Sequence, residues 1–293
     1  MPMKRSTLGL LSLIFAGLIF GSFGVWVRLL SVDLSSYQQI AFRNVIALGV
    51  ALLIIITTKI KLNFEGVSPK YLLLFGISFP IGVICYTLSV LNTTIMLSIF
   101  SFYLGSIFSS LLIGMLVFKE KITLQKALSL ALVVVGFSFF AKGFDSFNVG
   151  ILLGIVGGLF DVVSNSFRKH LSGKINRVVL TLIPQIGGII VATIFMIQSA
   201  TFQIPTITTS SWVVGIIFGA LLFSVNYLLL YGFQHFDLNL GTIAISSEVV
   251  FASLFGYLLF AETPSTTDLY GGLLIVIAII IGNLPSKIFQ KSY

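Results

Sequence analysis

Long apolar runs follow one another through this chain and decide what it can fold into. Each is long enough, or nearly so, to cross a hydrocarbon core of roughly 30 Å as a helix. Charged residues make up only 9% of the 293 residues, whereas a soluble domain has roughly 25%. The sequence therefore predicts an all-α membrane protein with ten transmembrane helices. The runs lie at 8–30, 36–58, 71–91, 94–117, 124–141, 149–171, 178–199, 211–233, 238–260 and 268–284.

Basic residues collect on one side of the predicted membrane. Most of the 17 Lys and Arg residues fall near the two ends of the chain or in separators on that same side, including the group from Arg168 to Arg177. Only Arg28 and Lys142 fall on the opposite side. Because cytoplasmic loops are rich in Lys and Arg, we expect both termini in the cytoplasm. This pattern predicts a multi-pass protein of the cytoplasmic (inner) membrane.

The two halves of the chain resemble each other. Leu8-Gly9-Leu10-Leu11 matches Val149-Gly150-Ile151-Leu152, and Phe118-Lys119-Glu120 matches Phe260-Ala261-Glu262. Each half would hold five spans, and an odd number inserts the second half upside down relative to the first. We therefore predict two inverted five-helix repeats, at 1–145 and 146–293. Secondary transporters have this architecture, with a substrate site near the midplane between the repeats.

The motifs resemble the ten-helix, EamA-type branch of the drug/metabolite transporter superfamily over essentially the whole chain. The resemblance rests on the helix-end residues Glu120 and Glu262, on Arg43 in the second run, and on Glu248. Glu248 stands where the family often has Glu-Pro, but the proline is missing here, and Ser106 stands at the matching point of the first half. The resemblance implies small metabolites such as amino acids or amines as cargo, usually exported.

Two acidic residues lie deep within apolar runs. Glu248 is about 15 Å from the cytoplasmic end of its run, and Asp161 is about 18 Å from the outer end of its run. Carboxylates in hydrocarbon are costly and mark functional sites by default. They could exchange protons or bind a substrate amine. The alternative is that each only hydrogen-bonds a neighbouring helix.

Other polar side chains are candidates for the same site. Arg43 lies about 9 Å from the outer end of its run; it could bind an anionic group through two hydrogen bonds, or reach the headgroups, or form a fixed ion pair. Asn165 follows Asp161 by four residues and so shares its helix face. Polar residues of this kind also simply hold helices together. The remaining candidates are Asn226, Tyr86 and Tyr103.

Four polar residues lie at the ends of runs. Glu120 and Glu262 each lie just before or at the start of the next helix, where a carboxylate can accept hydrogen bonds from free backbone N–H groups. We interpret both as structural. His235 and Asp237 lie at the cytoplasmic turn before the ninth run. They are gate or proton-relay candidates, and the simpler alternative is a solvated polar loop.

The motifs that are missing narrow the function. The sequence has no P-loop for ATP, no catalytic HExxH or GxSxG motif, and Cys85 as its single cysteine. We therefore expect no enzyme, no metal site and no cofactor. The net charge of +8 is explained by basic loops rather than by binding of nucleic acid.

These observations together predict a secondary active transporter that exports small polar metabolites, such as amino acids or amines, by alternating access. Its expected partners are the small-molecule substrate, the lipid bilayer and protons as the coupling ion. A monomer is sufficient as the transport unit, and a dimer is the alternative oligomeric state. Two alternatives remain: a membrane sensor or scaffold that transports nothing, and a facilitator of the same fold without ion coupling.

Overall fold

The computed structural model describes residues 5–92, 95–140, 149–199, 207–260 and 266–283. Helices account for all regular secondary structure in these ranges, apart from an isolated bridge between Ser172 and Ile175. The helices of the first part are α1 (Arg5–Gly21), α2 (Phe23–Leu30), α3 (Ser36–Thr57), α4 (Pro69–Asn92), α5 (Ile95–Leu116) and α6 (Leu124–Phe140). Those of the second part are α7 (Val149–Leu171), α8 (Arg177–Gln198), α9 (Thr209–His235), α10 (Leu238–Ile245), α11 (Glu248–Phe260) and α12 (Thr266–Asn283).

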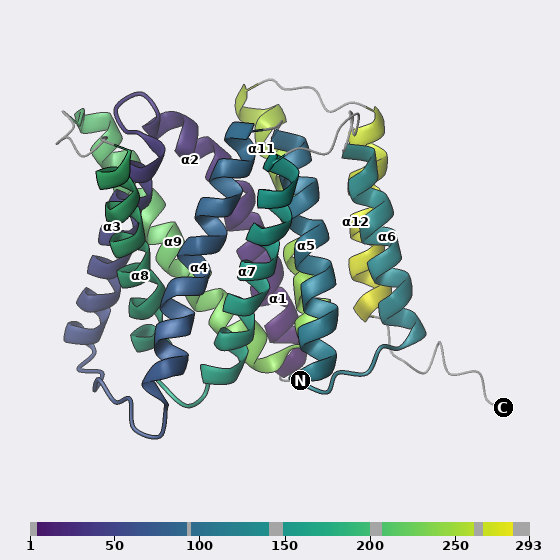
Figure 1. Cartoon of the computed structure of the whole chain (residues 1–293), viewed down its shortest axis with the longest axis horizontal. Helices are drawn as coiled ribbons and strands as arrows, with labels where there is room; N and C mark the ends of the chain where they lie inside the picture. The colour runs from purple at the N-terminus through teal and green to yellow at the C-terminus, as the bar shows by residue number, and fades with distance from the viewer. Residues whose placement is uncertain (1–4, 93–94, 141–148, 200–206, 261–265, 284–293) are drawn as a thin grey trace.

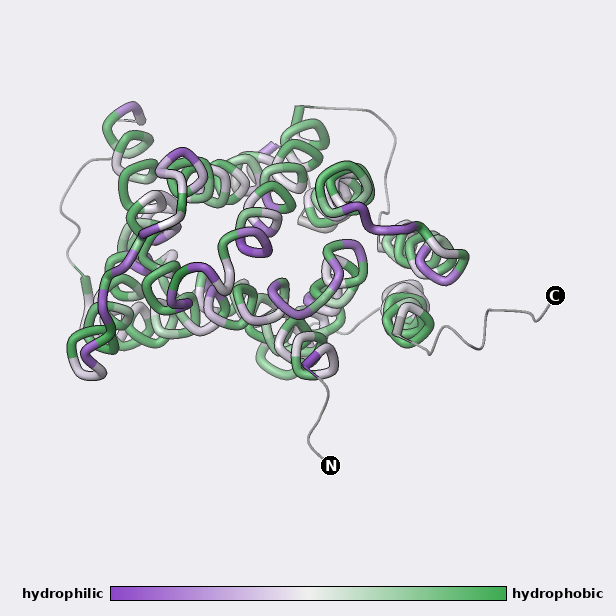
Figure 2. Tube along the Cα trace, turned by 90° about the horizontal axis from the view of Figure 1, so that it is seen from below, coloured by the Kyte–Doolittle hydropathy of each residue, from purple (hydrophilic) through white to green (hydrophobic). Residues whose placement is uncertain are grey.

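Many of these helices are long and apolar enough to cross a membrane. Seven such spans lie in the described residues, where α1 with α2 and α10 with most of α11 each count as one span. Three shorter apolar helices, Ser101–Leu116, Leu124–Phe139 and Leu269–Gly282, lie at the remaining predicted runs. Seen along the helix axes, hydrophobic segments dominate the helices of the bundle, and hydrophilic segments gather in the connections facing the viewer (Figure 2). The chain is therefore a multi-pass helical membrane protein.

Two of the predicted continuous helices are broken. The first span is interrupted at Ser22 and the ninth at Ser246–Ser247. The hydroxyl of Ser22 donates to the Ile19 carbonyl at 2.6 Å, and that of Ser246 donates to the Ile243 carbonyl at 2.6 Å. Such local bonds from serine to its own backbone bend helices. The predicted runs 8–30 and 238–260 each form one candidate span, with a break that the sequence did not indicate.

The broken helices pack against each other through glycines of α1. A side chain at Gly17 would meet Ser247 and the backbone of Glu248, and one at Gly21 would meet the Glu248 carbonyl at 2.8 Å. The backbones approach this closely only because glycine lacks a Cβ. The packing therefore fixes the break in the ninth span, and with it Glu248, against the first helix.

The helices form one bundle with a paired edge (Figure 1). α4 and α5 both pack on α7, α3 packs on α8, and α1 packs on α9. α6 and α12 pack mainly on each other, at the right in Figure 1. α1 begins and α12 ends at the lower edge of that view. The contacts of α4 and α5 with α7 join segments that the sequence assigns to different repeats.

Candidate functional site

A cavity inside the bundle joins four of the residues predicted to carry the chemistry. Its lining comes from α5, α7, α10 and the first residue of α11, which meet at the break in the ninth span. Its volume of about 40 Å³ has room for water-sized occupants. We call it the central cavity. It is lined by Phe102, Tyr103, Asp161, Asn165, Thr242, Ile245 and Glu248.

Glu248 opens α11 at the break and points to a tyrosine across the cavity. The Tyr103 hydroxyl of α5 donates to Glu248 Oε2 at 2.6 Å. The same ring stacks on Phe137 of α6, with centroids 4.7 Å apart. The hydroxyl is therefore held in place by ring packing, and the carboxylate is oriented by a donor from another helix. Tyr103 and Glu248, both candidates from the sequence, thus lie in contact at this cavity.

Asp161 begins a chain of polar contacts that leads away from the cavity. Asn165 Nδ2 donates to Asp161 Oδ2 at 3.0 Å, and Arg168 Nη1 donates to Asn165 Oδ1 at 2.6 Å. Arg168 Nη2 then donates to Asn226 Oδ1 on α9 at 2.9 Å. The two amides thus hold the guanidinium, and Asn165 bridges the guanidinium of Arg168 and the carboxylate of Asp161. Asn226 serves this chain and is not among the residues that line the central cavity.

Arg168 is the functional candidate that the sequence interpretation missed. It was counted among the basic residues of the cytoplasmic side, near the end of the run 149–171, but its side chain is 0% exposed, and its guanidinium lies over the rings of Phe75 and Phe79 at 5.6 and 5.0 Å. The signal was present in the sequence, since Asp161, Asn165 and Arg168 follow one another at spacings of four and three. Those spacings place the three side chains on one helix face.

Arg43 lies in a different cavity from the two acids. This second cavity, of about 10 Å³, is lined by residues of α3, α4, α8 and α9. α4 separates the two cavities, because Gly82 packs against Asp161 while Val83 lines the second cavity. The structure therefore does not combine Arg43 with Glu248 and Asp161 in one site, as the sequence interpretation had grouped them. The lining residues are Ile40, Arg43, Asn44, Phe79, Pro80, Val83, Gly188 and Leu222.

Two further predicted site residues lie beside the cavities or away from them. Tyr86 packs edge-on against Phe102, with ring centroids 5.3 Å apart, and so supports the central cavity from behind a lining residue. His235 contacts its own helix, with Nδ1 at 3.0 Å from the Tyr231 carbonyl. His235 therefore joins neither cavity. Within the described ranges, no group of three or more His, Cys, Asp or Glu residues could hold a metal ion.

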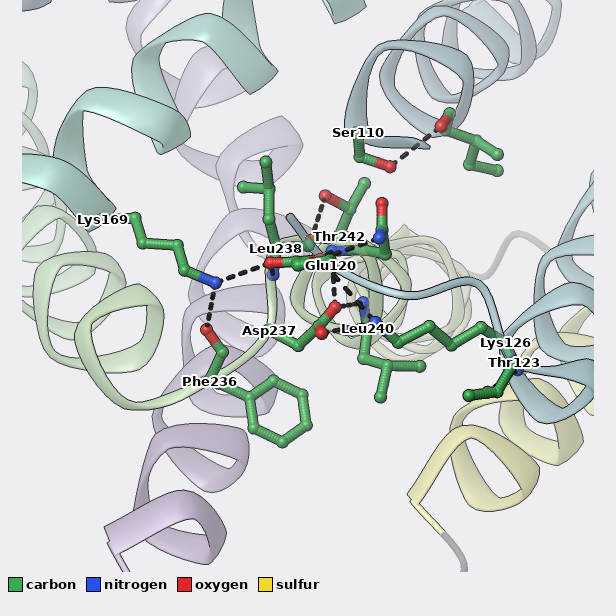
Figure 3. Close-up of polar contacts among 12 residues, drawn as sticks. Ser110, Glu120, Thr123, Lys126, Lys169, Phe236, Asp237, Leu238, Leu240 and Thr242 are labelled. Atoms are coloured by element: carbon green, nitrogen blue, oxygen red, sulfur yellow. Dashed lines mark hydrogen bonds and ion pairs between the residues drawn. The ribbon is translucent and has the colours of Figure 1, made fainter. Parts of the chain in front are cut away.

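A cluster of charged side chains surrounds Glu120, in the connection between α5 and α6 (Figure 3). The Glu120 carboxylate is 7% exposed and accepts hydrogen bonds from Lys169 Nζ at 2.7 Å and from the Leu238 amide at 2.7 Å. Lys126 pairs with Asp237 and lies 3.8 Å from Glu120. The cluster thus contains two carboxylates and two ammonium groups. We call Glu120, Lys126, Lys169, Asp237 and Asn239 the Glu120 cluster.

The cluster corrects the local interpretation of Glu120. We expected this carboxylate to accept N–H groups at the start of the next helix, α6. It accepts instead from the first amides of α10, Leu238 and Asn239, more than 100 residues away in the chain. Asp237, a predicted gate residue, caps the same helix by accepting from the Asn239 amide at 3.0 Å. Glu262, which matches Glu120 in the second half of the chain, lies outside the described residues.

The two carboxylates of the cluster have opposite shifts in pKa. Burial, followed by the adjacent Asp237 carboxylate, raises the pKa of Glu120 above its ordinary value of 4.5. Burial alone would raise the pKa of Asp237 too, but the contacts with Glu120 and Lys126 outweigh it and lower the pKa below 3.8. Asp237 is therefore the member that stays ionised, paired with Lys126.

Comparisons with known proteins agree with this architecture. Residues 148–284 match the model of the EamA-like transporter family. A solved crystal structure superposes with a TM-score of 0.79 at 14% sequence identity, covering 98% of this chain and 100% of the other. At that identity the likeness shows the fold alone. None of the curated proteins compared matches the sequence. The resemblance inferred from the motifs is therefore confirmed over residues 148–284, which match the EamA-like transporter family of the drug/metabolite transporter superfamily.

Proposed function

We propose that this protein is a secondary active transporter that exports small amine-bearing metabolites in exchange for protons. One observation carries the proposal: the central cavity is lined by two carboxylates, Glu248 and Asp161, with no cationic side chain among its lining residues. Carboxylates inside a membrane bundle mark substrate or proton pathways by default. A protonated amine or a proton supplies the missing positive charge.

The two carboxylates have different roles in this proposal. Asp161 has a fixed counter-charge nearby, because Asn165 connects it to the guanidinium of Arg168. Glu248 has only the neutral hydroxyl of Tyr103 as a hydrogen-bond donor among the described residues. Burying an uncompensated charge costs several kcal/mol. Glu248 is therefore the group that alternates between a proton and the substrate amine, while Asp161 fixes the far side of the site.

An amine explains the geometry better than a zwitterion does. The carboxylate of an amino acid would need a cation in the same cavity, and Arg43 lines the other one. Phe102 and Tyr103 add aromatic rings to the lining, and aromatic rings favour an ammonium group. The present cavity is too small for a metabolite, so binding must accompany a widening of the bundle. Amino acids remain in the proposal as the weaker substrate class.

Alternating access in this proposal uses ten transmembrane helices arranged as two inverted repeats, 1–145 and 146–293. The lower end of the bundle in Figure 1 faces the cytoplasm, as the basic connections indicate. The Glu120 cluster joins the connection after α5 to the ends of α7 and α10. Asp237, with Lys126 and Glu120, would then close the cytoplasmic entrance, and these contacts would separate when the entrance opens.

Reconstituted vesicles provide the test. Putrescine and ornithine differ by one carboxylate, and each is added outside vesicles that contain the protein and a trapped pH-sensitive dye. We expect a proton flux with putrescine, a weaker one with ornithine, and neither with Glu248→Gln or with empty vesicles. Flux of labelled putrescine that neither responds to a pH gradient nor moves protons would favour the uncoupled facilitator. No flux of any amine or amino acid would favour a sensor or scaffold.

A further inference from the structure

Arg43 is a buried charge that the described protein does not neutralise. Its side chain is 9% exposed. No carboxylate pairs with it among the described residues, whose ion pairs all belong to the Glu120 cluster. Its Nε atom is buried without a hydrogen-bond partner. The Nε atom of Arg168 is also unpartnered, but its two terminal nitrogens donate to asparagine oxygens.

Aromatic contacts compensate only part of the charge. The guanidinium carbon of Arg43 lies 5.0 Å from the centroid of Phe218 and 5.9 Å from that of Phe23. A desolvated cation–π contact is favourable, but it recovers only part of the free energy that removing an ion from water costs, even after relaxation of the protein. The rings therefore leave a deficit that a negative charge would cover.

Arg43 borders a space that such a charge could enter. It lines the second cavity, whose other walls are mostly apolar: Ile40, Phe79, Pro80, Val83 and Leu222. The cavity's volume of about 10 Å³ is near the minimum for one water molecule, so binding of an anion must widen it, as binding of a metabolite must widen the central cavity. Asn44 contributes the remaining polar side chain of the lining, with Nδ2 bonded to the Ile40 carbonyl at 2.7 Å. Arg43 is therefore the one charged group that faces the space.

We propose that the second cavity binds one monovalent anion against Arg43, either a free halide or the carboxylate of a small molecule. The guanidinium supplies the charge and the fork of N–H donors that anions require. The apolar walls exclude water and strengthen the attraction. The site is independent of the amine site, because α4 lies between the two cavities. It stands even if the protein transports no amine.

Anion-dependent stability tests the site. The purified protein is unfolded by heat at constant ionic strength while sodium gluconate is replaced by sodium chloride or by sodium acetate. A ligand that binds only the folded state raises the unfolding temperature in a saturable way. We expect a rise of a few degrees for the wild type, retained in Arg43→Lys and lost in Arg43→Gln. Arg28→Gln, a change outside the cavity lining, should keep the wild-type response.

The arms of the experiment distinguish the sources. A response to chloride identifies a free inorganic ion, and a response to acetate alone identifies a carboxylate. Chloride NMR line broadening gives a second measurement, which should disappear in Arg43→Gln. If Arg43→Gln does not fold, the anion-dependent rise in unfolding temperature of the wild type and of Arg43→Lys decides whether the site binds an anion. Equal unfolding temperatures in all three salts, or an unchanged response in Arg43→Gln, would overturn the proposal.

Discussion

The Glu120 cluster and the central cavity contain the same kinds of acidic side chain in opposite electrostatic settings. Glu120 and Asp237 lie among two lysines and the first amides of α10. Glu248 and Asp161 share a cavity in which no lining residue is a cation. A carboxylate with several charged donors is held in one protonation state. A carboxylate whose only donor is neutral can gain or lose a proton at a low cost in free energy. In the proposed mechanism, the first region closes the entrance and the second region carries the chemistry.

The sharpest way to break this comparison is to remove one charge from each region with the same substitution. Glu120→Gln leaves Lys169 and Lys126 without full compensation, so we expect a loss of roughly 3 kcal/mol in the free energy of unfolding. Glu248→Gln should change it by less than about 1 kcal/mol, because Tyr103 can still donate to the amide oxygen. Denaturant unfolding in detergent measures both. Equal losses would show that the two regions do not differ as described.

Arg168 tests whether the central cavity has a hidden counter-charge. Arg168→Met leaves the oxygens of Asn165 and Asn226 without their donor, and each buried, unpaired oxygen costs about 1–3 kcal/mol. We expect a loss of about 2 kcal/mol in unfolding free energy. Arg177→Met is the matched control, since Arg177 is only partly buried and bonds Gln234 at 3.0 Å. Its loss should stay near 0.5 kcal/mol, and a loss as large as that of Arg168→Met would contradict the buried network.

Lys169 tests whether the Glu120 cluster opens. Thr242 lines the central cavity and is 3% exposed, so a cysteine placed there in a Cys85→Ala background reports access to the cavity. Lys169→Met removes the 2.7 Å ion pair with Glu120. Labelling by a maleimide should become about tenfold faster, which corresponds to roughly 1.4 kcal/mol.

Lys174→Met is the control for that experiment, since the exposed Lys174 contacts His170 and lies outside the cluster. Its labelling rate should equal that of the parent protein. A rate in Lys169→Met that is unchanged would mean that the cluster is a fixed brace rather than a gate.

Substitution of Asp33 should give the smallest change in stability of the carboxylate substitutions, because this residue lies outside both regions. It is exposed, and the hydroxyl and amide of Thr208 donate to its carboxylate at 2.6 and 2.8 Å, which lowers the pKa of Asp33 below 3.8. A lowered folded-state pKa stabilises the fold above the unfolded value and loses that effect as the pH falls. The small difference in unfolding temperature between wild type and Asp33→Asn should therefore shrink as the pH falls below about 3.8 and vanish once the pH has passed the lowered folded-state pKa. A difference that grows in acid would contradict the Thr208 contacts.

The sequence was sufficient for the apolar helices, and it singled out Glu248, Asp161, Asn165 and Tyr103, which all line the central cavity. Apolar runs and acids at mid-run are local signals, and membrane depth converts them into position. The breaks at Ser22 and Ser246 were not predicted, because a serine that bonds to its own backbone looks like any other small residue of a span. The motif resemblance, in contrast, identified the family.

Long-range partners were the part that the sequence could not provide. Arg168 ends a run beside Lys169, where a basic residue is usually solvated, and only Asn226 on α9 shows that it is buried. Glu120 could have accepted amides from its own next helix, and nothing local distinguishes that choice from α10. Arg43 was grouped with the acids because depth along a helix does not say which cavity a side chain faces.

The burial of Arg168 also limits the order in which the bundle can assemble. Phe75 and Phe79 of α4 are synthesised before Arg168, but Asn226 follows it by 58 residues. A bare guanidinium in hydrocarbon is costly. Until α9 is inserted, the end of α7 must therefore remain near water or hold its charge against α4 alone. α7 can settle at its final depth only when α9 has been inserted. The second half of the chain therefore completes its folding as a unit after synthesis of Asn226.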